Sequence, residues 1–415
     1  MAIDAQDRYR EAPAARPTLP AHPSMNALPV AADAPPRLAR HLPGLDGLRA
    51  IAILLVIPHN LNLFGTPTGW SEHLLGSLLD RGWIGVQLFF VLSGFLITGI
   101  LLDSRGRSSY YISFCARRAL RILPLYYASL LIIFVVLPLL GGLPASLPRN
   151  PGSEFSYWLL YSNWYGPFHE GQGSMPHLWS LAVEEQFYLL WPLLIHRRTP
   201  VGVVRMCLAI ATASLGIRCA MLLGGAPTEA IYSFLVTRMD GLALGGAAAA
   251  ALRTPGLATL LNQRRRACCW AGAILLFSGA ATTRAFTFSS AVTLSWGYLA
   301  LAGAFTLFIV SVACSDSGPR AAGLAKGLRS GPLQRIGRHS YAMYLLHVPL
   351  HVLVGQPLLA ALGLSQDKSA LLNLTYIALG VGASFAAAVA AYWAVEVHFN
   401  RLKTRLVPAV DRGVG

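Results

Sequence analysis

The stretch LDGLRAIAILLVIPHN, Leu45 to Asn60, is an almost continuous apolar run that carries Arg49 and His59 near its two ends. About 20 apolar residues suffice for a helix that crosses a bilayer, so the run predicts a membrane-spanning helix. Ionisable side chains are rare and costly inside such helices, and where they occur they usually serve a function. The stretch therefore predicts a membrane protein with a functional site in its first span.

The composition of the whole chain supports this prediction. Of the 415 residues, 54% are hydrophobic and only 12% are charged, whereas soluble domains have about 25% charged residues. Apolar runs recur along the chain and predict an all-α, polytopic fold of about ten membrane helices. The predicted spans begin near Leu45, Gly82, Ile122, His177, Val201, Thr228, Ala267, Ala291, Ile336 and Leu371.

The net charge of +15 is spread over short clusters between the spans, which argues against nucleic-acid binding and for orientation in a membrane. With ten spans, most Lys and Arg residues between the spans fall on the cytoplasmic side, together with both termini. The loops assigned to the opposite side hold only Arg81, Arg149, Arg284 and Lys368.

The predicted domain organisation is a disordered cytoplasmic tail over 1–40, a transmembrane domain over 41–403 and a cytoplasmic tail over 404–415. The first segment is rich in Ala and Pro and has no apolar core of a signal peptide. Six cysteines show no metal-ligand spacing, so free thiols and no metal site are expected.

Arg49 and His59 lie ten residues apart, which places them about 15 Å apart along one helix. Histidine exchanges a proton near neutral pH and suits a general base, whereas arginine suits a phosphate or carboxylate ligand. The structural alternative is an arginine that reaches the membrane surface and a histidine that bonds to a neighbouring helix.

A second cationic group lies in SYYISFCARRALRILPLYY, Ser109 to Tyr127. Arg117, Arg118 and Arg121 are expected in a loop that leads into a span, with Pro124 in the first helical turn. Arg118 and Arg121 are three residues apart and share one face. The arginines predict a site for a phosphorylated donor, or alternatively a topological signal that also binds anionic lipids.

Two adjacent acids occur in HLWSLAVEEQFYLLWPLL, His177 to Leu194. Glu184 and Glu185 differ by about 100° around a helix, so only one is expected to face a partner such as an arginine. At least one of them is a candidate for catalysis, and Trp179 and Ser180 of the same segment are candidate substrate-binding residues.

The remaining spans add further candidates. In IGVQLFFVLSGFLIT, Ile84 to Thr98, we expect Gly85 and Gly94 to pack against other helices and Ser93 and Gln87 to line a cavity. Arg238 and Asp240 are expected to form an ion pair or to reach neighbouring helices. Arg238, Asp240, Tyr341 and His347 are also candidate substrate-binding residues. The aromatic segment 153–177 is either an interfacial anchor or a cover over a substrate entrance.

Together these segments make the chain similar to the acyltransferase family 3 membrane proteins, in a stand-alone form without a hydrolase-like domain. Seven segments occur in family order over Leu45 to Lys403. They are LDGLRAIAILLVIPH, IGVQLFFVLSGFLIT, ARRALRILPLYY, HLWSLAVEEQFYLLWP, TRMDGLALG, IGRHSYAMYLLHVPL and AVEVHFNRLK.

The resemblance implies a membrane O-acyltransferase of the bacterial inner membrane. It implies transfer of an acyl group, commonly acetyl from acetyl-CoA, to a saccharide hydroxyl, with no permanently bound cofactor. It further implies an essential His59, with Arg49 in the donor site beside Arg118 and Arg121. We expect Glu184 or Glu185 to orient His59. The alternative is a transporter or exporter of a glycan or an acylated metabolite.

The chain departs from the family pattern in two ways. Nine residues separate Arg49 from His59 where ten are usual, which rotates His59 by about 80° relative to Arg49. Pro58 is expected to bend the helix and restore the geometry. Gln87 also stands where the family commonly has an acid, so another group must take over any role of that acid.

Overall fold

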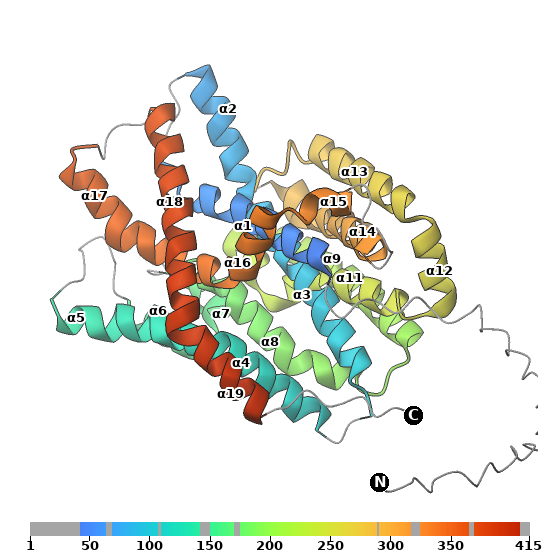
Figure 1. Cartoon of the computed structure of the whole chain (residues 1–415). Helices are drawn as coiled ribbons and strands as arrows, with labels where there is room; N and C mark the ends of the chain where they lie inside the picture. Colours follow the sequence, from blue (N-terminus) through green and yellow to red (C-terminus); the bar gives the residue numbers. More distant parts are fainter. Residues whose placement is uncertain are drawn as a thin grey trace, which may run out of the picture. The chain divides into compact units, whose positions relative to one another are not determined.

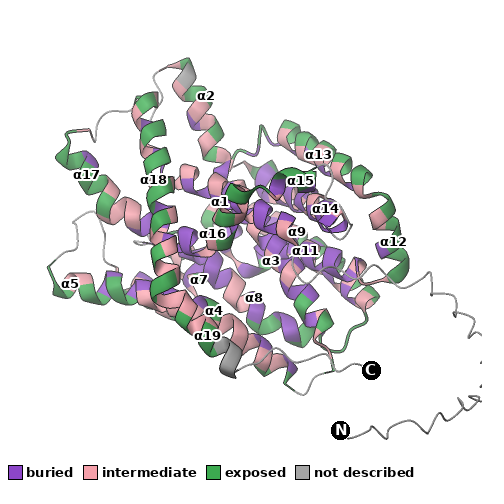
Figure 2. Cartoon of the chain, viewed as in Figure 1, coloured by how far each residue is buried: buried purple, intermediate pink, exposed green. Residues whose placement is uncertain are grey.

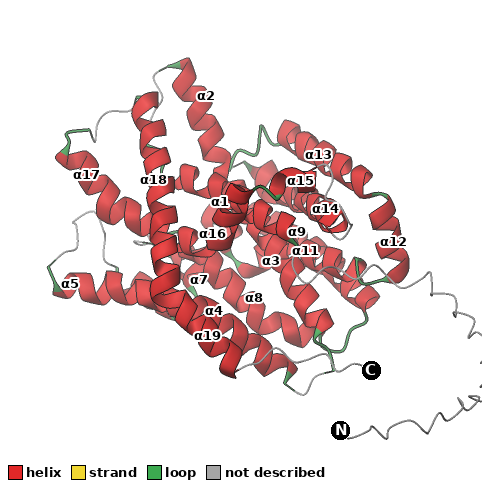
Figure 3. Cartoon of the chain, in the orientation of Figure 1, coloured by secondary structure: helices red, strands yellow, loops and turns green. Residues whose placement is uncertain are grey.

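The structure is a computed structural model that describes residues 42–63, 69–106, 109–141, 150–169, 175–288, 290–316, 324–364 and 369–406. Regular secondary structure in these residues is entirely helical (Figure 3), which confirms the predicted all-α class. The described residues belong to one compact unit, Pro35–Gly415. The predicted tail over 1–40 lies outside the described residues. The last helix extends to Leu406, three residues beyond the predicted end of the transmembrane domain.

The helices follow one another with short connections (Figure 1). The first half contains α1 (Pro43–Asn60), α2 (Trp70–Leu79), η1 (Asp80–Trp83), α3 (Ile84–Asp103), α4 (Tyr110–Leu131), η2 (Ile132–Val136), α5 (Leu137–Leu139), α6 (Pro151–Trp158), α7 (Ser162–Tyr165), η3 (Gly166–Phe168), α8 (Leu178–Ile195) and α9 (Pro200–Leu223). The second half contains α10 (Thr228–Ser233), α11 (Leu235–Ala251), α12 (Pro255–Gln263), α13 (Arg265–Thr282), η4 (Thr293–Gly297), α14 (Tyr298–Asp316), α15 (Leu324–Leu328), α16 (Gly331–Leu350), η5 (His351–Gly355), α17 (Gln356–Ala361), α18 (Ala370–Ala391), η6 (Tyr392–Glu396) and α19 (Val397–Leu406).

Six helical runs of the described residues are long and apolar enough to cross a membrane. They are Glu72–Asp103, Tyr110–Leu139, Pro200–Leu223, Thr293–Asp316, Gly331–Ala361 and Ala370–Leu402. A seventh candidate is the pair Thr228–Ala251 and Pro255–Gln263, whose halves are bent by 100° at a break. The chain is therefore a polytopic helical membrane protein.

The predicted count of ten spans is not confirmed. The three remaining predicted spans correspond to α1, α8 and α13, each a helix of 18 residues. Each of these helices carries two or more charged residues, which lower its hydropathy. In α1 they include Asp46 and Arg49, and in α8 they are Glu184 and Glu185.

The predicted start of the third span near Ile122 is wrong. Helix α4 begins at Tyr110, so Arg117, Arg118 and Arg121 lie within the helix and not in a loop. Tyr110 and Phe114, four residues apart, bury one apolar face of this first part of α4. That packing extends the helix, and Pro124 consequently lies in its interior. The predicted loop at Arg81 is also helical, because α2, η1 and α3 form one continuous run.

Buried residues concentrate on α1, α3, α11 and α14, whereas α13, α17 and α18 are largely exposed or half-buried (Figure 2). Helix α1 contacts α16 and α3, and α11 contacts α3 and α9 (Figure 1). Exposed apolar side chains such as Trp270, Ile274 and Phe277 cover α13. Such a large exposed apolar face is suited to contact with lipid.

Small residues let the central helices approach closely, as expected for membrane helices. A Cβ atom added at Gly94 of α3 would collide with the backbone carbonyl of Leu242 of α11. A Cβ atom added at Gly85 would similarly meet the backbone carbonyl of Ala52 of α1. The predicted packing role of Gly85 and Gly94 is thereby confirmed.

The described part of the aromatic segment, 153–169 and 175–177, contains the short helices α6, α7 and η3, and α7 contacts α8. Asn150 caps α6 by accepting hydrogen bonds from the backbone N–H groups of Gly152 and Ser153. Gln186 of α8 exchanges hydrogen bonds with Asn163, at 2.8 and 3.2 Å, and accepts one from Trp164 at 3.1 Å. Gln186 therefore fixes this segment to the helix that carries Glu184 and Glu185.

Candidate active site

A polar pocket lies between α1, α3, α4, α8 and α16, and we call it the arginine pocket. Its polar lining consists of Arg49, Ser93, Arg118, Arg121, Ser180, Glu184, Tyr188, Arg338, Ser340, Tyr341 and Tyr344. Four cationic side chains thus face one cavity together with one carboxyl group. Arg121 and Arg338 are exposed, whereas Ser180, Tyr188 and Tyr344 are buried. The charged end of the pocket is therefore its open end.

Two of the three arginines of α4 reach the pocket. Arg118 and Arg121 share one face of α4 and both line the cavity. Arg117 lies about 100° from Arg118 but only about 40° from Arg121 around the helix, and it is not among the lining residues. The guanidinium of Arg118 lies 5.9 Å from the ring centroids of both Phe114 and Tyr188. Arg49 forms an ion pair with Asp46, at 3.0 Å, one turn earlier in α1.

Glu184 and Glu185 occupy different surroundings, as their positions on the helix predict. Glu184 lines the arginine pocket and accepts a hydrogen bond from the Tyr188 hydroxyl at 3.0 Å. Because the Tyr188 hydroxyl donates its proton to Glu184, the Ser93 hydroxyl donates to the Tyr188 hydroxyl oxygen, 2.7 Å away. Glu185 does not line the pocket, and its Oε1 has no hydrogen-bond partner among the described residues.

A second cavity, which we call the histidine pocket, contains His59. It is lined by Val56, His59, Asn60, Asp80, Arg81, Trp83, Val86, Pro176, His177, Trp179, Tyr232, Phe286, Thr287, Phe288 and Tyr344. Val86 and Tyr344 line both pockets. The two cavities are therefore neighbours on either side of a shared wall.

The tautomer of His59 follows from its hydrogen bond. Nδ1 lies 3.2 Å from the backbone carbonyl oxygen of Leu79, and a carbonyl can only accept. Nδ1 therefore carries the proton and Nε2 keeps a lone pair that can take one. Helix α1 continues through Pro58 to Asn60, and a Cβ atom at Gly82 would meet Cβ of His59 at 2.7 Å. Close backbone packing thus holds the imidazole in place.

The structure does not bring His59 and Glu184 together. Glu184 lines the arginine pocket, and His59 lines the histidine pocket. The group that orients His59 is the Leu79 carbonyl, where the sequence suggested a carboxylate. Of the other predicted residues, Ser93, Ser180 and Tyr341 line the arginine pocket and Trp179 lines the histidine pocket.

His347 lines neither pocket. It is buried on α16, where its Nδ1 donates to the Tyr344 backbone carbonyl at 2.6 Å. Its ring lies edge-on to that of His177, with 5.1 Å between the centroids. The Tyr341 hydroxyl donates to the Ile122 carbonyl of α4 at 2.7 Å, which ties α16 to the helix of the arginines.

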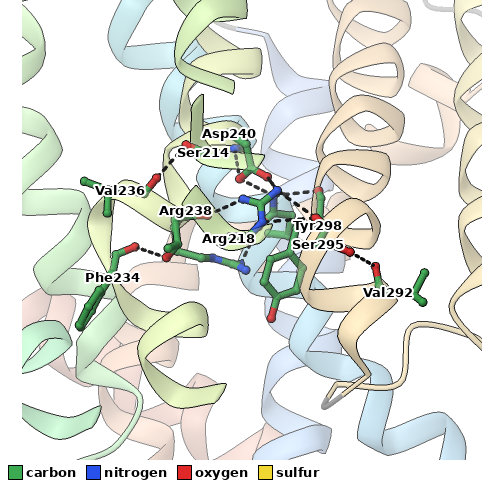
Figure 4. Close-up of polar contacts among 12 residues, drawn as sticks. Ser214, Arg218, Phe234, Val236, Arg238, Asp240, Val292, Ser295 and Tyr298 are labelled. Atoms are coloured by element: carbon green, nitrogen blue, oxygen red, sulfur yellow. Dashed lines mark hydrogen bonds and ion pairs between the residues drawn. The ribbon is translucent and has the colours of Figure 1, made fainter. Parts of the chain in front are cut away.

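Arg238 and Asp240 belong to a buried charge cluster (Figure 4). The expected ion pair between them is wrong, because Asp240 pairs with Arg218 of α9 at 2.8 Å. Arg238 instead donates to the side chain of Gln87 at 2.6 Å, and its guanidinium lies 4.2 Å from the ring centroid of Tyr298. Gln87 thus lies in this cluster and, within the described part of the chain, not on the wall of either pocket.

Several residues of these sites were not predicted from the sequence. Arg218 had a visible signal, because it is a single arginine in an apolar run. Tyr188 also had one, since it lies one turn after Glu184 in the same helix. Asp80 and Tyr232 had no such signal in the sequence, because they line the histidine pocket through contacts between helices that are far apart in sequence.

The six cysteines are free thiols, as expected. Within the described ranges, no cluster of three or more His, Cys, Asp or Glu side chains has the geometry to hold a metal ion.

Comparison with known proteins identifies the family of this chain. Residues 42–393 match the family model described as an acyltransferase domain, that of acyltransferase family 3. The chain is 32% identical over 333 residues to the O-acetyltransferase OatA of Staphylococcus aureus (strain NCTC 8325 / PS 47), with 76% of this chain and 51% of the relative covered.

Two further relatives are similar to the same extent. The peptidoglycan O-acetyltransferase OatA of Listeria monocytogenes is 30% identical over 329 residues, with 75% of this chain and 49% of the relative covered. The putative peptidoglycan O-acetyltransferase YrhL of Bacillus subtilis is 31% identical over 332 residues, with 76% and 49% covered. The chain thus spans about half the length of these relatives, and no solved structure matches it. The family model covers most of the chain, which therefore belongs to acyltransferase family 3.

Proposed function

We propose that the protein is a membrane O-acyltransferase that moves an acyl group, acetyl in the first instance, from acyl-CoA to a hydroxyl of a saccharide-containing acceptor. One observation carries the proposal. A pocket with four arginines and a pocket with His59 lie on either side of a wall formed by Val86 and Tyr344. This arrangement offers separate sites for an anionic donor and a neutral acceptor, with the base at the acceptor side.

The arginine pocket suits the phosphate groups of the donor. Guanidinium groups bind phosphate oxygens through paired, charge-assisted hydrogen bonds. Arg121 and Arg338 at the open end can meet the donor first, and Arg118 lies deeper in the pocket. We infer that the acyl thioester reaches past these residues toward the shared wall.

The histidine pocket supplies the base. The hydroxyl oxygen of the acceptor attacks the thioester carbon, and its proton passes to Nε2 of His59. A carbon–oxygen ester bond forms as the carbon–sulfur bond breaks, and the CoA thiolate takes the proton back from His59. The Leu79 carbonyl accepts the hydrogen bond from Nδ1 throughout, so it keeps the tautomer that the step requires.

The names of the relatives support a glycan acceptor, because two of them are described as peptidoglycan O-acetyltransferases. Peptidoglycan fragments are therefore the first acceptors to test. We further propose ten spans with both termini in the cytoplasm of a bacterial inner membrane. The Lys and Arg distribution supports this topology, and labelling of single cysteines introduced into each loop would test it.

The decisive experiment uses the full chain in lipid nanodiscs with radiolabelled acetyl-CoA and lysozyme-released peptidoglycan fragments. We expect free CoA and acetylated fragments to form in equal amounts, with the ester located by mass spectrometry. The proposal would be contradicted if the protein transported the fragments across the membrane of proteoliposomes while the acetyl group stayed on CoA. That result would support an exporter.

A further inference from the structure

His177 is a second histidine of the histidine pocket, and the reaction described above does not use it. Its ring is buried, with only 5% of the residue exposed, although the residue lines the pocket. Nε2 lies 3.2 Å from the backbone carbonyl oxygen of Leu345. Because a carbonyl only accepts, Nε2 carries the proton and Nδ1 keeps a lone pair. Nδ1 has no hydrogen-bond partner among the described residues.

Trp83 presents the complementary group in the same pocket. Its residue is 2% exposed, and Nε1 finds no hydrogen-bond acceptor in the described part of the chain. An indole N–H can only donate, whereas Nδ1 of His177 in this tautomer can only accept. A buried polar group that is left without a partner is destabilising. Two residues that line one pocket therefore carry an unused donor and an unused acceptor.

A hydroxyl group is the ligand chemistry that satisfies both, because it donates one hydrogen bond and accepts others. The same pocket is lined by the rings of Trp179 and Tyr232, whose centroids are 4.5 Å apart. Aromatic side chains with a few placed polar groups are typical of small-molecule sites. A sugar ring combines an apolar C–H face with several hydroxyls and matches this lining.

We propose that His177 is an acceptor-positioning residue. Its Nδ1 accepts a hydrogen bond from a hydroxyl next to the one that His59 deprotonates, and Trp83 donates to an oxygen of the same sugar. The acceptor class is therefore a saccharide with at least two neighbouring hydroxyls. The inference rests on the proposed function, since it assigns how the acceptor of that reaction is held.

Kinetics of the full chain in nanodiscs test this assignment. In His177→Phe a planar ring is kept, but the Nδ1 acceptor and the Nε2–H donor to the Leu345 carbonyl are both lost. In His177→Asn the amide oxygen takes the place of Nδ1 and only the Nε2–H donor is lost, so the difference between the two variants reports on the acceptor atom. We expect His177→Phe to raise KM for peptidoglycan fragments by about tenfold, the loss of one hydrogen bond, and His177→Asn to recover part of it. KM for acetyl-CoA should not change, whereas a general structural defect would raise KM for acetyl-CoA as well.

Trp83→Phe provides an independent arm, because it removes the N–H donor and part of the indole but keeps an aromatic ring beside Tyr232 and Phe288. It should raise KM for the fragments to a similar degree. His339→Gln is the matched control, since His339 is half-buried on α16 and lines neither pocket. Unchanged KM for the fragments in both His177→Phe and Trp83→Phe would overturn the inference, as would equal rises in KM for both substrates.

A binding measurement separates this inference from the proposed function. Saturation-transfer NMR with the same fragments should show binding to the wild-type protein and loss of binding to His177→Phe. If the wild-type protein binds the fragments in this way but transfers no acetyl group, the proposed function fails and the saccharide site stands. If it transfers acetyl groups and His177→Phe binds the fragments as the wild type does, the inference fails alone.

Discussion

Arg218 and Asp240 form an ion pair across two helices, with Nη2 2.8 Å from Oδ2 and both side chains fully buried. Arg218 also donates to the Thr237 and Ser295 carbonyls. Arg238, two residues before Asp240, adds a second buried guanidinium without a carboxylate partner of its own among the described residues. Asp240 is therefore the acid on which this cationic cluster depends.

The first prediction concerns this pair. We expect Asp240→Leu or Arg218→Met to lower the free energy of unfolding by about 3–5 kcal/mol, because each leaves a buried charge without its partner. The double variant Arg218→Met with Asp240→Leu should lose far less than the sum. Thermal unfolding in detergent, followed by size-exclusion chromatography, measures all three. Additive losses would mean that the two side chains do not stabilise the fold as a pair.

A second prediction concerns the contact between α3 and α11. Gly94→Ala should destabilise the protein by about 1–3 kcal/mol, because the new methyl group meets the backbone carbonyl of Leu242, which cannot rotate away. Gly216→Ala on α9 is the matched control, since its Cβ atom would enter open space. There alanine should stabilise the helix slightly through its higher propensity. Effects of the same sign at the two positions would contradict the packing argument.

Much of this architecture was predictable from the sequence, because apolar runs and intramembrane charges are local signals. Arg49, Arg118, Arg121 and Glu184 line one pocket, which agrees with the expectation that one of the two carboxylates faces an arginine. That this pocket binds the donor stays a prediction. The boundaries were less predictable. Helix α4 begins at Tyr110, twelve residues before the predicted start at Ile122, and aromatic residues form its first turns ahead of the arginines.

The partners of individual side chains were not predictable. In a membrane helix both the lipid-facing and the protein-facing sides are apolar, so hydropathy does not fix the rotation of a helix about its axis. The pairing of Asp240 with Arg218, not Arg238, depends on that rotation. So does the separation of His59 from Glu184, which places the two side chains in different pockets.

The third prediction tests the donor site. Arg118→Ala should raise KM for acetyl-CoA by roughly 10- to 100-fold, the loss of one charge-assisted hydrogen bond of about 1.5–3 kcal/mol, and Arg118→Lys should raise it less. Arg117→Ala is the control, because Arg117 is adjacent in sequence but does not line the pocket. Steady-state kinetics with varied acetyl-CoA and fixed acceptor give these values. Equal effects of the two alanine variants would indicate that general cationic charge, and not the pocket, attracts the donor.

The last prediction isolates the base. In His59→Asn the amide nitrogen can take the place of Nδ1 and keep the hydrogen bond to the Leu79 carbonyl, while the lone pair of Nε2 is removed. Because general-base catalysis contributes about 10²–10⁴-fold, kcat for acetyl transfer should fall by that factor, with little change in either KM. His73→Gln, on the exposed part of α2, is the control and should retain the wild-type rate.

Two measurements make the assignment of His59 specific. Thermal unfolding of His59→Asn should match that of the wild type, because the contact with Leu79 is kept and Gly82 still packs against the Cβ atom. A folded His59→Asn protein with the wild-type kcat would remove His59 from the reaction. The base would then have to be sought among the other ionisable groups of the histidine pocket, of which Asp80 lies nearest in sequence to the Leu79 carbonyl.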